Sequence, residues 1–385
     1  MPTPQEPIRI AIIGTSARSD YLYGPLIQKI SEQVELVSVW GRSVESAKRL
    51  GESLGVPWYT DLDQLIRETA PSIGVVSVAY HANGQVGLMA VEHGLHVLLE
   101  TPIAHRLDEA DAIIHAATRL GRKVEVAEQF HRRPREAIKL KLLASGLFGR
   151  VYSSFSDFAG HGYHGISVMR SYLGFDARPV RVTGMGGQYD LAAHWSRLAG
   201  TRGPRTEVQE HGLITFDDGR IGVFHWTSIG YDSALRWWRS SRFLAEKGMG
   251  VTLHDGTNVQ EVLTLLASGG EASRTITLQP RRERTDGGQI YGMTAHTGDP
   301  EQPIVSWEAP VIPMVKGHGV QLEDDDLAVM GCLLSLVNAV RTDTAPTYGA
   351  QQARLDQELT LAIQYSARHD GEPVNLPMDP AMQDA

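Results

Sequence analysis

The chain has 385 residues, of which 42% are hydrophobic and 21% are charged. That length exceeds what a single hydrophobic core usually organises, so the sequence predicts a globular protein of two domains. The formal net charge of −9 argues against nucleic acid and against an anionic membrane as general partners.

Cysteine usage and hydropathy indicate a soluble, cytoplasmic protein. Cys332 is the single cysteine, which rules out an intramolecular disulfide, and it lies in the apolar run 327–340, where we expect a buried, inert thiol. No apolar stretch reaches the roughly 18–20 residues of a membrane span. The segment IRIAIIG near the N-terminus is strand-like and lacks the basic start and longer apolar core of a signal peptide.

Short apolar β runs alternate with helical patterns in the first part of the chain, which is typical of βαβ units and a parallel sheet. The expected strands are Ile8–Ile13, Glu35–Trp40, Ile73–Ala79, His96–Leu99 and Lys123–Ala127. The expected helices between them are Pro25–Gln33, Val44–Leu54, Leu62–Glu68, Gly84–His93 and Leu107–Leu120. The pattern predicts an NAD(P)-binding Rossmann domain, a doubly wound parallel sheet, over residues 1–145.

After a further helix at Arg135–Ala144 the pattern changes, and residues 146–385 are expected to form a substrate and oligomerisation domain of α+β type. Turn signals such as Asp217-Asp218-Gly219 predict hairpins in a large, open, mostly antiparallel sheet. The expected strands are Val151–Phe158, Val180–Met185, Glu210–Phe216, Ile221–Ser228, Gly250–Leu253, Glu261–Leu266 and Arg274–Leu278, with a helix at Gly165–Leu173. The closing helices, Asp324–Val340 and Ala350–Ala367, are expected to pack back toward the Rossmann domain.

The strand Ile8–Ile13 runs into a glycine and then a helix, which is the place where a doubly wound sheet holds a dinucleotide pyrophosphate. The usual G-x-G-x-x-G pattern is reduced here, because serines stand at its second and third glycine positions. Small side chains still permit close approach of the backbone. The candidate phosphate-binding residues are Gly14, Thr15, Ser16, Ala17 and Arg18.

The end of the second strand predicts the cofactor. A site that prefers NAD usually places an acidic residue there to bind the ribose 2′-hydroxyl, whereas Arg42 and Ser43 offer donors suited to a 2′-phosphate. We therefore expect NADP, with NAD as the alternative if Arg42 is only a solvated loop charge.

The order of features resembles the Gfo/Idh/MocA family, named for glucose–fructose oxidoreductase, inositol dehydrogenase and the rhizopine protein. The resemblance runs through IRIAIIG, GRSVESAKRLGESLGV, TDLDQLI, AVEHGLHVLLETPIA, GLFGRV, HGYHGISVMRSYLG and LTLAIQYSARHDGEPVNLP, almost the whole chain. It implies a Rossmann domain, a second domain on an open mixed sheet and a nicotinamide cofactor. It also implies a homodimer or homotetramer assembled through that sheet.

The chain departs from the family pattern at the triplet E-K-P, whose lysine reaches the reacting hydroxyl and the nicotinamide ribose. Here the triplet is Glu100-Thr101-Pro102, and a threonine hydroxyl can form hydrogen bonds but carries no charge. We expect the loop shape to be kept and Thr101 to orient the substrate oxygen.

A second departure concerns the family motif D-x-G-x-H-x-x-D, whose histidine is the acid/base. His164 aligns with that histidine, while Gly160 and Ser167 stand where the aspartates would be. His164 is therefore the expected acid/base and substrate contact, since histidine ionises near neutral pH. His161 as a substitute partner, or Tyr163 as a phenolic donor, is an alternative participant.

The resemblance implies further contacts with substrate and cofactor. The alternative is that these residues are solvated loop positions. Arg132 and Arg133 are candidate substrate contacts. Candidate cofactor contacts are Ala79, His81, Asn83, Glu100, Thr101, Pro102 and Gln129. The scattered histidines, including His194, His211 and His225, lack a metal-ligand motif, so no metal is expected.

Together these observations predict an oxidoreductase that interconverts a secondary alcohol and a ketone on a sugar, glycoside or cyclitol. Two alternatives remain open. One is a lyase, epimerase or glycosidase-like enzyme that oxidises the sugar transiently and recycles its cofactor. The other is an NADP(H)-binding sensor or partner subunit with impaired catalysis.

Overall fold

The computed structural model describes residues 6–159, 162–267, 270–284, 287–315 and 322–384, in two compact units. The first unit comprises Met1–Arg133, Arg282–Tyr291 and Glu308–Gln357, and the second comprises Pro134–Arg281, Gly292–Trp307 and Glu358–Ala385. The units interleave along the chain, and each is described by itself below. The domain boundary predicted after residue 145 stays a prediction.

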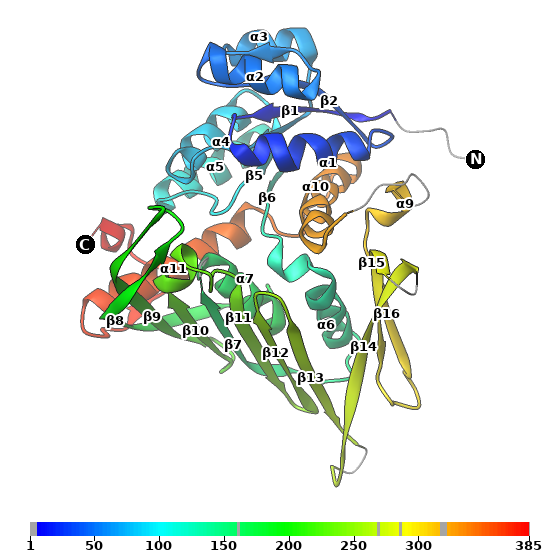
Figure 1. Cartoon of the computed structure of the whole chain (residues 1–385), viewed down its shortest axis with the longest axis vertical. Helices are drawn as coiled ribbons and strands as arrows, with labels where there is room; N and C mark the ends of the chain where they lie inside the picture. Colours follow the sequence, from blue (N-terminus) through cyan, green and yellow to red (C-terminus); the bar gives the residue numbers. More distant parts are fainter. Residues whose placement is uncertain (1–5, 160–161, 268–269, 285–286, 316–321, 385) are drawn as a thin grey trace. The chain divides into compact units, whose positions relative to one another are not determined.

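A parallel sheet forms the centre of the first unit, with six strands among the described residues in the order β3-β2-β1-β4-β5-β6. Figure 1 labels β1, β2, β5 and β6 of this sheet. The strands are β1 Ile8–Ile13, β2 Val34–Trp40, β3 Trp58–Tyr59, β4 Ile73–Val76, β5 His96–Leu99 and β6 Val124–Val126. The strand order reverses between β1 and β4, and in open α/β sheets a ligand binds at the carboxyl ends of the strands beside such a reversal.

Helices connect these parallel strands. They are η1 Ser19–Tyr23 (a π-helical segment), α1 Gly24–Lys29, α2 Val44–Leu54, α3 Leu62–Thr69, α4 Asn83–Glu92 and α5 Leu107–Leu120, with short 3₁₀ turns η2 Tyr80–Ala82 and η3 Phe130–Arg132. All four residues of β4 are buried, as expected of a strand covered on both faces.

The first unit also contains α10, Asp324–Thr342, which packs on β5 and β6. Its acidic start forms a capping box, in which Glu323 and Asp326 each bond the other's backbone amide, and carboxylates at that end favour the helix dipole. Cys332 on α10 is fully buried, as predicted, and burial raises the pKa of its thiol to about 12. No helix in the described part of the chain is long and apolar enough to cross a membrane.

An open mixed sheet dominates the second unit, with eleven strands among the described residues in the order β16-β15-β14-β13-β12-β11-β7-β10-β9-β8-β17. The strands are β7 Val151–Ala159, β8 Pro179–Ser196, β9 Thr201–Phe216, β10 Ile221–Thr227, β11 Trp238–Ala245, β12 Gly248–Asp255, β13 Val259–Leu266, β14 Ser273–Arg284, β15 Gly287–His296, β16 Ile304–Glu308 and β17 Val374–Asn375. The helices are α6 Pro134–Ala144, α7 Gly162–Leu173, α8 Ser228–Asp232, α9 Ile312–Val315 (first unit) and α11 Ala350–Arg368, which contains the border between the units.

Helix α7 packs on one face of this sheet, against β7 and β10. Two glycines permit the close approach. A Cβ at Gly165 would lie 3.0 Å from the ring of Phe224, and one at Gly222 would lie 2.6 Å from the sulfur of Met169. The β7–β10 pair is parallel and most of the other pairs are antiparallel, so the predicted fold class, a Rossmann unit plus a large, mostly antiparallel sheet, is confirmed.

Lys139 of α6 contacts strand β12 of the second sheet, and only 1% of its side chain is exposed. Its Nζ donates to Glu136 Oε1 at 2.8 Å and to Thr252 Oγ1 at 2.6 Å, and Glu261 lies 3.7 Å away. Tyr172 donates to the other oxygen of Glu136. Burial lowers the pKa of Lys139, but the attraction of Glu136 outweighs burial, and the pKa lies above its ordinary value.

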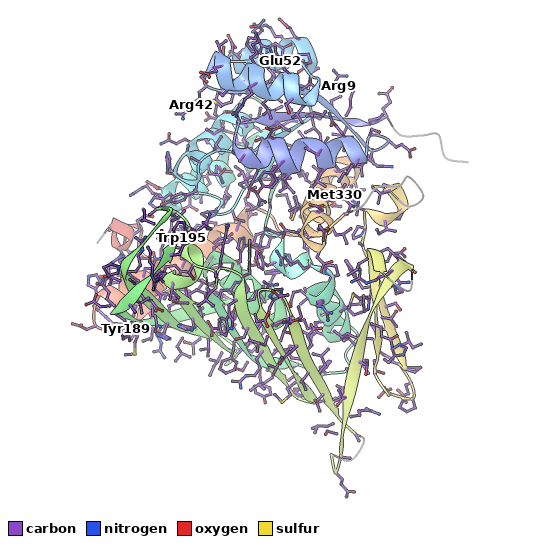
Figure 2. All side chains as sticks on the ribbon, in the orientation of Figure 1. Arg9, Arg42, Glu52, Tyr189, Trp195 and Met330 are labelled. Carbon is purple, nitrogen blue, oxygen red and sulfur yellow. The ribbon has the colours of Figure 1, made fainter. Side chains whose placement is uncertain are left out.

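We predict that Lys139→Met destabilises the second unit, because two carboxylates lose their buried cation. Removing one partner of a buried ion pair costs about 3–5 kcal/mol. Urea unfolding followed by circular dichroism measures the change. Lys48→Met is the matched control, since Lys48 and Glu52 form an exposed pair on α2 (Figure 2), worth about 0.3–0.5 kcal/mol. Equal unfolding midpoints for the two variants would contradict the structural role of Lys139.

Candidate active site

The turn after β1 brings the backbone close to the end of β4. Gly14 has a φ of +117°, a conformation that side chains disfavour, and a Cβ at this position would clash with the carbonyl oxygen of Ser77. Ser16 Oγ lies 2.7 Å from Ser77 Oγ, which ties the turn to β4. The serine at the second position of the glycine pattern therefore joins two strand ends through its hydroxyl.

Helical structure begins at Ala17, directly after this turn. The amide N–H of Ser19 donates to Ser16 Oγ at 3.3 Å, so Ser16 caps the helix, and Ser19 Oγ donates to the carbonyl oxygen of Gly14 at 3.0 Å. The first N–H groups of a helix have no acceptor inside it, and together with the helix dipole they favour an anion. A pyrophosphate group fits this arrangement.

The loop after β5 carries Glu100, whose carboxylate receives two side chains from the start of the first helix. Arg18 Nε donates to Glu100 Oε1, and Tyr23 OH donates to the same oxygen at 2.7 Å. The amide N–H of Thr101 donates to Glu100 Oε2 at 3.3 Å. Burial and the charge of Glu100 raise the pKa of Tyr23 well above its ordinary value, so the phenol stays protonated as the donor.

Asn83, the first residue of α4, shapes the same loop from the other side. Its Nδ2 donates to the carbonyl oxygens of Glu100 at 2.6 Å and of Pro102 at 2.7 Å, and the Thr101–Pro102 bond is cis. Asn83 is fully buried. It therefore holds the backbone on both sides of Thr101, and its amide nitrogen is occupied by the protein.

The residues expected to choose between NAD and NADP follow β2. Arg42 is exposed on the surface of the first unit (Figure 2). Ser43 is the N-cap of α2, and its Oγ accepts from the amide N–H of Ser46 at 3.2 Å. Ser43 Oγ also lies 2.8 Å from Ser46 Oγ, where either hydroxyl can donate, so a phosphate that accepts from Ser43 would replace Ser46 as the acceptor or leave Ser46 as the donor.

Two further candidates follow β4 at the same edge of the sheet. Ala79 and His81 are both exposed, and His81 lies in the short turn η2. The ring of His81 makes an edge contact with Tyr80 at 6.1 Å between centroids. The first unit thus brings the candidates after β1, β4 and β5 to one edge of the sheet.

The candidates that follow β6 have protein partners. Gln129 is buried at the start of η3. Arg132 forms an ion pair with the fully buried Glu125 and donates to Thr347 Oγ1 at 2.8 Å. Arg133 donates to Asp325 Oδ1 at 2.8 Å. The guanidinium of Arg132 thus anchors a buried network, and its contact with substrate stays a prediction.

In the second unit, His164 and Tyr163 lie in the first turn of α7. His164 is 7% exposed and Tyr163 is partly exposed, with their ring centroids 6.2 Å apart. His161, the alternative partner, and Gly160, at the first missing aspartate, lie outside the described residues. Ser167, at the second missing aspartate, is fully buried in α7.

Two of the scattered histidines meet on the sheet. His211 and His225 stack with centroids 4.5 Å apart, and His225 Nδ1 lies 2.9 Å from Asp157 Oδ1. Asp157 raises the pKa of His225, while burial and His225 lower that of His211. Among the described residues, no group of three or more His, Cys, Asp or Glu side chains is arranged to hold a metal ion.

A family model described as "Oxidoreductase family, NAD-binding Rossmann fold" (GFO_IDH_MocA) matches residues 8–128. Residues 8–128 are thus similar to the NAD-binding Rossmann domain of this oxidoreductase family. The glycine turn, the helix start and the Glu100 loop described above all fall within the matched segment.

Two curated relatives share this region. The D-glucoside 3-dehydrogenase of Escherichia coli is 27% identical over 148 residues, which cover 38% of this chain and 42% of that protein. The levoglucosan dehydrogenase of Pseudarthrobacter phenanthrenivorans is 29% identical over 114 residues, which cover 29% of this chain and 28% of that protein. The matched segments thus span less than half the length of these Gfo/Idh/MocA-like relatives.

The whole chain shares its fold with solved structures. A levoglucosan dehydrogenase in complex with NADH and L-sorbose superposes with a TM-score of 0.70 over 97% of this chain and 100% of that chain. The sequence identity is 14%, so this likeness concerns the fold alone.

Sequence reasoning missed two residues of this candidate site, Tyr23 and Ser77. Tyr23 contacts Glu100 across 77 positions of the chain, and Ser77 contacts Ser16 across 61. The signal for Ser77 was its place in a buried β run, two residues before Ala79. The sequence held no local signal for Tyr23. Only the strand order brings the segment after β1, which carries Tyr23, to the loop after β5, which carries Glu100.

Gly14→Ala should weaken NADP(H) binding at least about 10-fold, because the new Cβ displaces the turn from the end of β4. Titration of the intrinsic or cofactor fluorescence measures the dissociation constant. Gly121→Ala is the control: Gly121 also has a positive φ, +63°, but a Cβ there meets only open space at the end of α5. Unchanged binding in Gly14→Ala would remove this turn from the cofactor site.

Proposed function

We propose that the protein is an NADP(H)-dependent oxidoreductase that interconverts a secondary alcohol and a ketone on a sugar, glycoside or cyclitol. One observation carries the proposal: the glycine turn and the Glu100-Thr101-Pro102 loop lie at one edge of a parallel sheet in a domain of an NAD-binding family. The names of the two curated relatives, both sugar dehydrogenases, support the substrate class.

The residues of the first unit bind and orient. Backbone N–H groups of Ala17 and Arg18 at the helix start bind the pyrophosphate, and Arg42 with Ser43 binds the 2′-phosphate. The nicotinamide ring, when bound, accepts or gives the hydride. Thr101, held by Glu100 and Asn83, donates its hydroxyl hydrogen to the substrate oxygen.

The residues of the second unit handle the proton. His164 accepts the hydroxyl proton during oxidation and returns it during reduction. Tyr163, its neighbour on α7, is the second candidate for this proton, since a phenol can donate. Arg132 and Arg133, the two arginines after β6, are the candidate contacts for substrate.

We also propose that copies of this chain assemble through the open face of the second sheet. That face of the sheet points away from α7. On it, strand register pairs Leu213 with Val223 and Val262 with Val251. Leu213 and Val262 are about half exposed in the single chain. An exposed apolar face of this kind is typical of a homo-oligomer interface.

NADPH should bind at least about 10-fold more tightly than NADH, a difference of about 1.4 kcal/mol. Arg42→Ala should remove most of that preference, because the 2′-phosphate loses its cation, and should leave NADH binding unchanged. Isothermal titration with both cofactors measures the effect, and Arg49→Ala, an exposed arginine on α2, is the control. Equal affinities in the native protein would exclude the NADP assignment.

The reaction is tested by following absorbance at 340 nm with a panel of sugars, glycosides and cyclitols. His164→Ala should lower kcat by about 10²–10⁴-fold and leave cofactor binding intact.

His115→Ala, at an exposed position on α5, is the control for the loss of a histidine. If His164→Ala kept near-normal turnover and Tyr163→Phe lost it, the proton transfer would be assigned to Tyr163 instead of His164. Full activity in both variants would locate the chemistry elsewhere.

A further inference from the structure

The side chain of Arg18 connects two strand ends of the first sheet. Its backbone belongs to the helix start after β1, and its guanidinium contacts Glu100, directly after β5. In the sheet order β4 lies between β1 and β5, so the side chain extends past the end of β4. In a doubly wound sheet the two halves of a dinucleotide bind on opposite sides of the reversal between β1 and β4. Arg18 therefore reaches from the pyrophosphate turn into the half that holds the nicotinamide.

The guanidinium keeps donors for a ligand. Arginine has five N–H donors, and Glu100 accepts from the one on Nε, which leaves those of the two terminal nitrogens. The side chain of Arg18 is 31% exposed, whereas that of Glu100 is 14% exposed. Burial lowers the pKa of Arg18, but the attraction of Glu100 outweighs burial, so the guanidinium is a permanent cation.

A cation at this place has chemical use in alcohol oxidation. The substrate oxygen gains negative charge as the hydroxyl proton leaves, and a preorganised positive charge stabilises that state. Thr101 offers only a neutral hydroxyl. Arg18 is a cation that contacts the loop carrying Thr101, through Glu100 and within one unit.

We propose that Arg18 supplies the positive charge at the reacting end of the site, with Glu100 and Tyr23 holding its guanidinium in place. The inference rests on the proposed function, since it concerns the same cofactor and the same oxidation. It differs from the assignment of Arg18 to the pyrophosphate, because it places the charge of the side chain beside the nicotinamide ring.

The two assignments are separated by comparing NADP⁺ with NADPH. Both carry the same pyrophosphate and 2′-phosphate, but the oxidised ring has a positive charge and the reduced ring is neutral. A cation beside the ring weakens NADP⁺ relative to NADPH by electrostatic repulsion. Arg18→Met should therefore shift the ratio of the two dissociation constants in favour of NADP⁺, on the order of 5-fold. An equal loss of affinity for both forms would show a contact with the pyrophosphate only and would overturn the proposal.

Three variants make this test specific. Arg18→Lys keeps the charge and should keep the ratio within about 2-fold of native. Arg18→Gln removes the charge but keeps a donor for Glu100, so it should shift the ratio in the same direction as Arg18→Met. It replaces Arg18→Met in the test if the methionine variant does not fold. Arg9→Met removes an arginine that pairs with Glu35 in the first unit (Figure 2), and it should leave the ratio unchanged.

A kinetic arm uses Thr101→Lys. In Arg18→Met, kcat should fall by about 10²-fold with little change in KM for the sugar. Adding Thr101→Lys to Arg18→Met should restore a large part of kcat, whereas Thr101→Lys alone should lower it, because two cations would then repel each other. A further loss in the double variant would contradict the charge role of Arg18.

The proposal and the proposed function fail in different ways. A native protein that binds both cofactor forms but turns over no sugar in the panel would refute the proposed activity. The binding ratio would still decide where the charge of Arg18 lies. An unchanged ratio in Arg18→Met and Arg18→Gln would refute the inference even in an active enzyme.

Discussion

The carboxylate of Glu100 joins the turn after β1 to the loop after β5, and the candidate site depends on this junction. It accepts from Arg18, from Tyr23 and from the amide N–H of Thr101. A carboxylate that is largely removed from water requires such partners, because an unpaired buried charge is costly. These three hydrogen bonds therefore fix the loop that presents Thr101. They also fix the side chain of Arg18, which reaches past the end of β4.

This junction explains how a neutral residue at position 101 is compatible with a redox site. A lysine at that position would bring an ammonium into the loop beside the guanidinium of Arg18, and like charges at such range repel. With Thr101, position 101 adds no second cation beside Arg18. The identities of residues 18, 100 and 101 are therefore physically coupled, although they lie far apart in the sequence.

Elements with local signals were predictable from the sequence. Helices α2 and α5 have the predicted bounds, because each ends before a glycine with positive φ, Gly55 or Gly121. Strand β11 was missed because Arg239 and Arg242 interrupt its apolar pattern, and the long ribbon of β8 and β9 extends through polar residues. Periodicity detects burial, and it fails where strand pairing alone holds the chain.

The site was predictable to the same degree. Gly14 and Glu100 could be placed at one edge because the ends of parallel strands meet there. That Arg18 and Tyr23 are the partners of Glu100 could not be predicted, because other arginines and tyrosines also stand near strand ends. Only the strand order brings Arg18 and Tyr23 to Glu100. The partner of Arg132 was equally unpredictable. Its place after β6 favours a substrate contact, which stays a prediction, and the structure adds an ion pair with the buried Glu125.

Arginine in place of lysine also divides the chemistry between residues. A lysine can stabilise an oxyanion and also release a proton, whereas an arginine stays charged at every working pH and can do only the first. If Arg18 provides the charge, the proton must pass through another group, and His164 in the second unit is the residue proposed for that step. The proposed mechanism thus assigns the charge to the first unit and the proton transfer to the second.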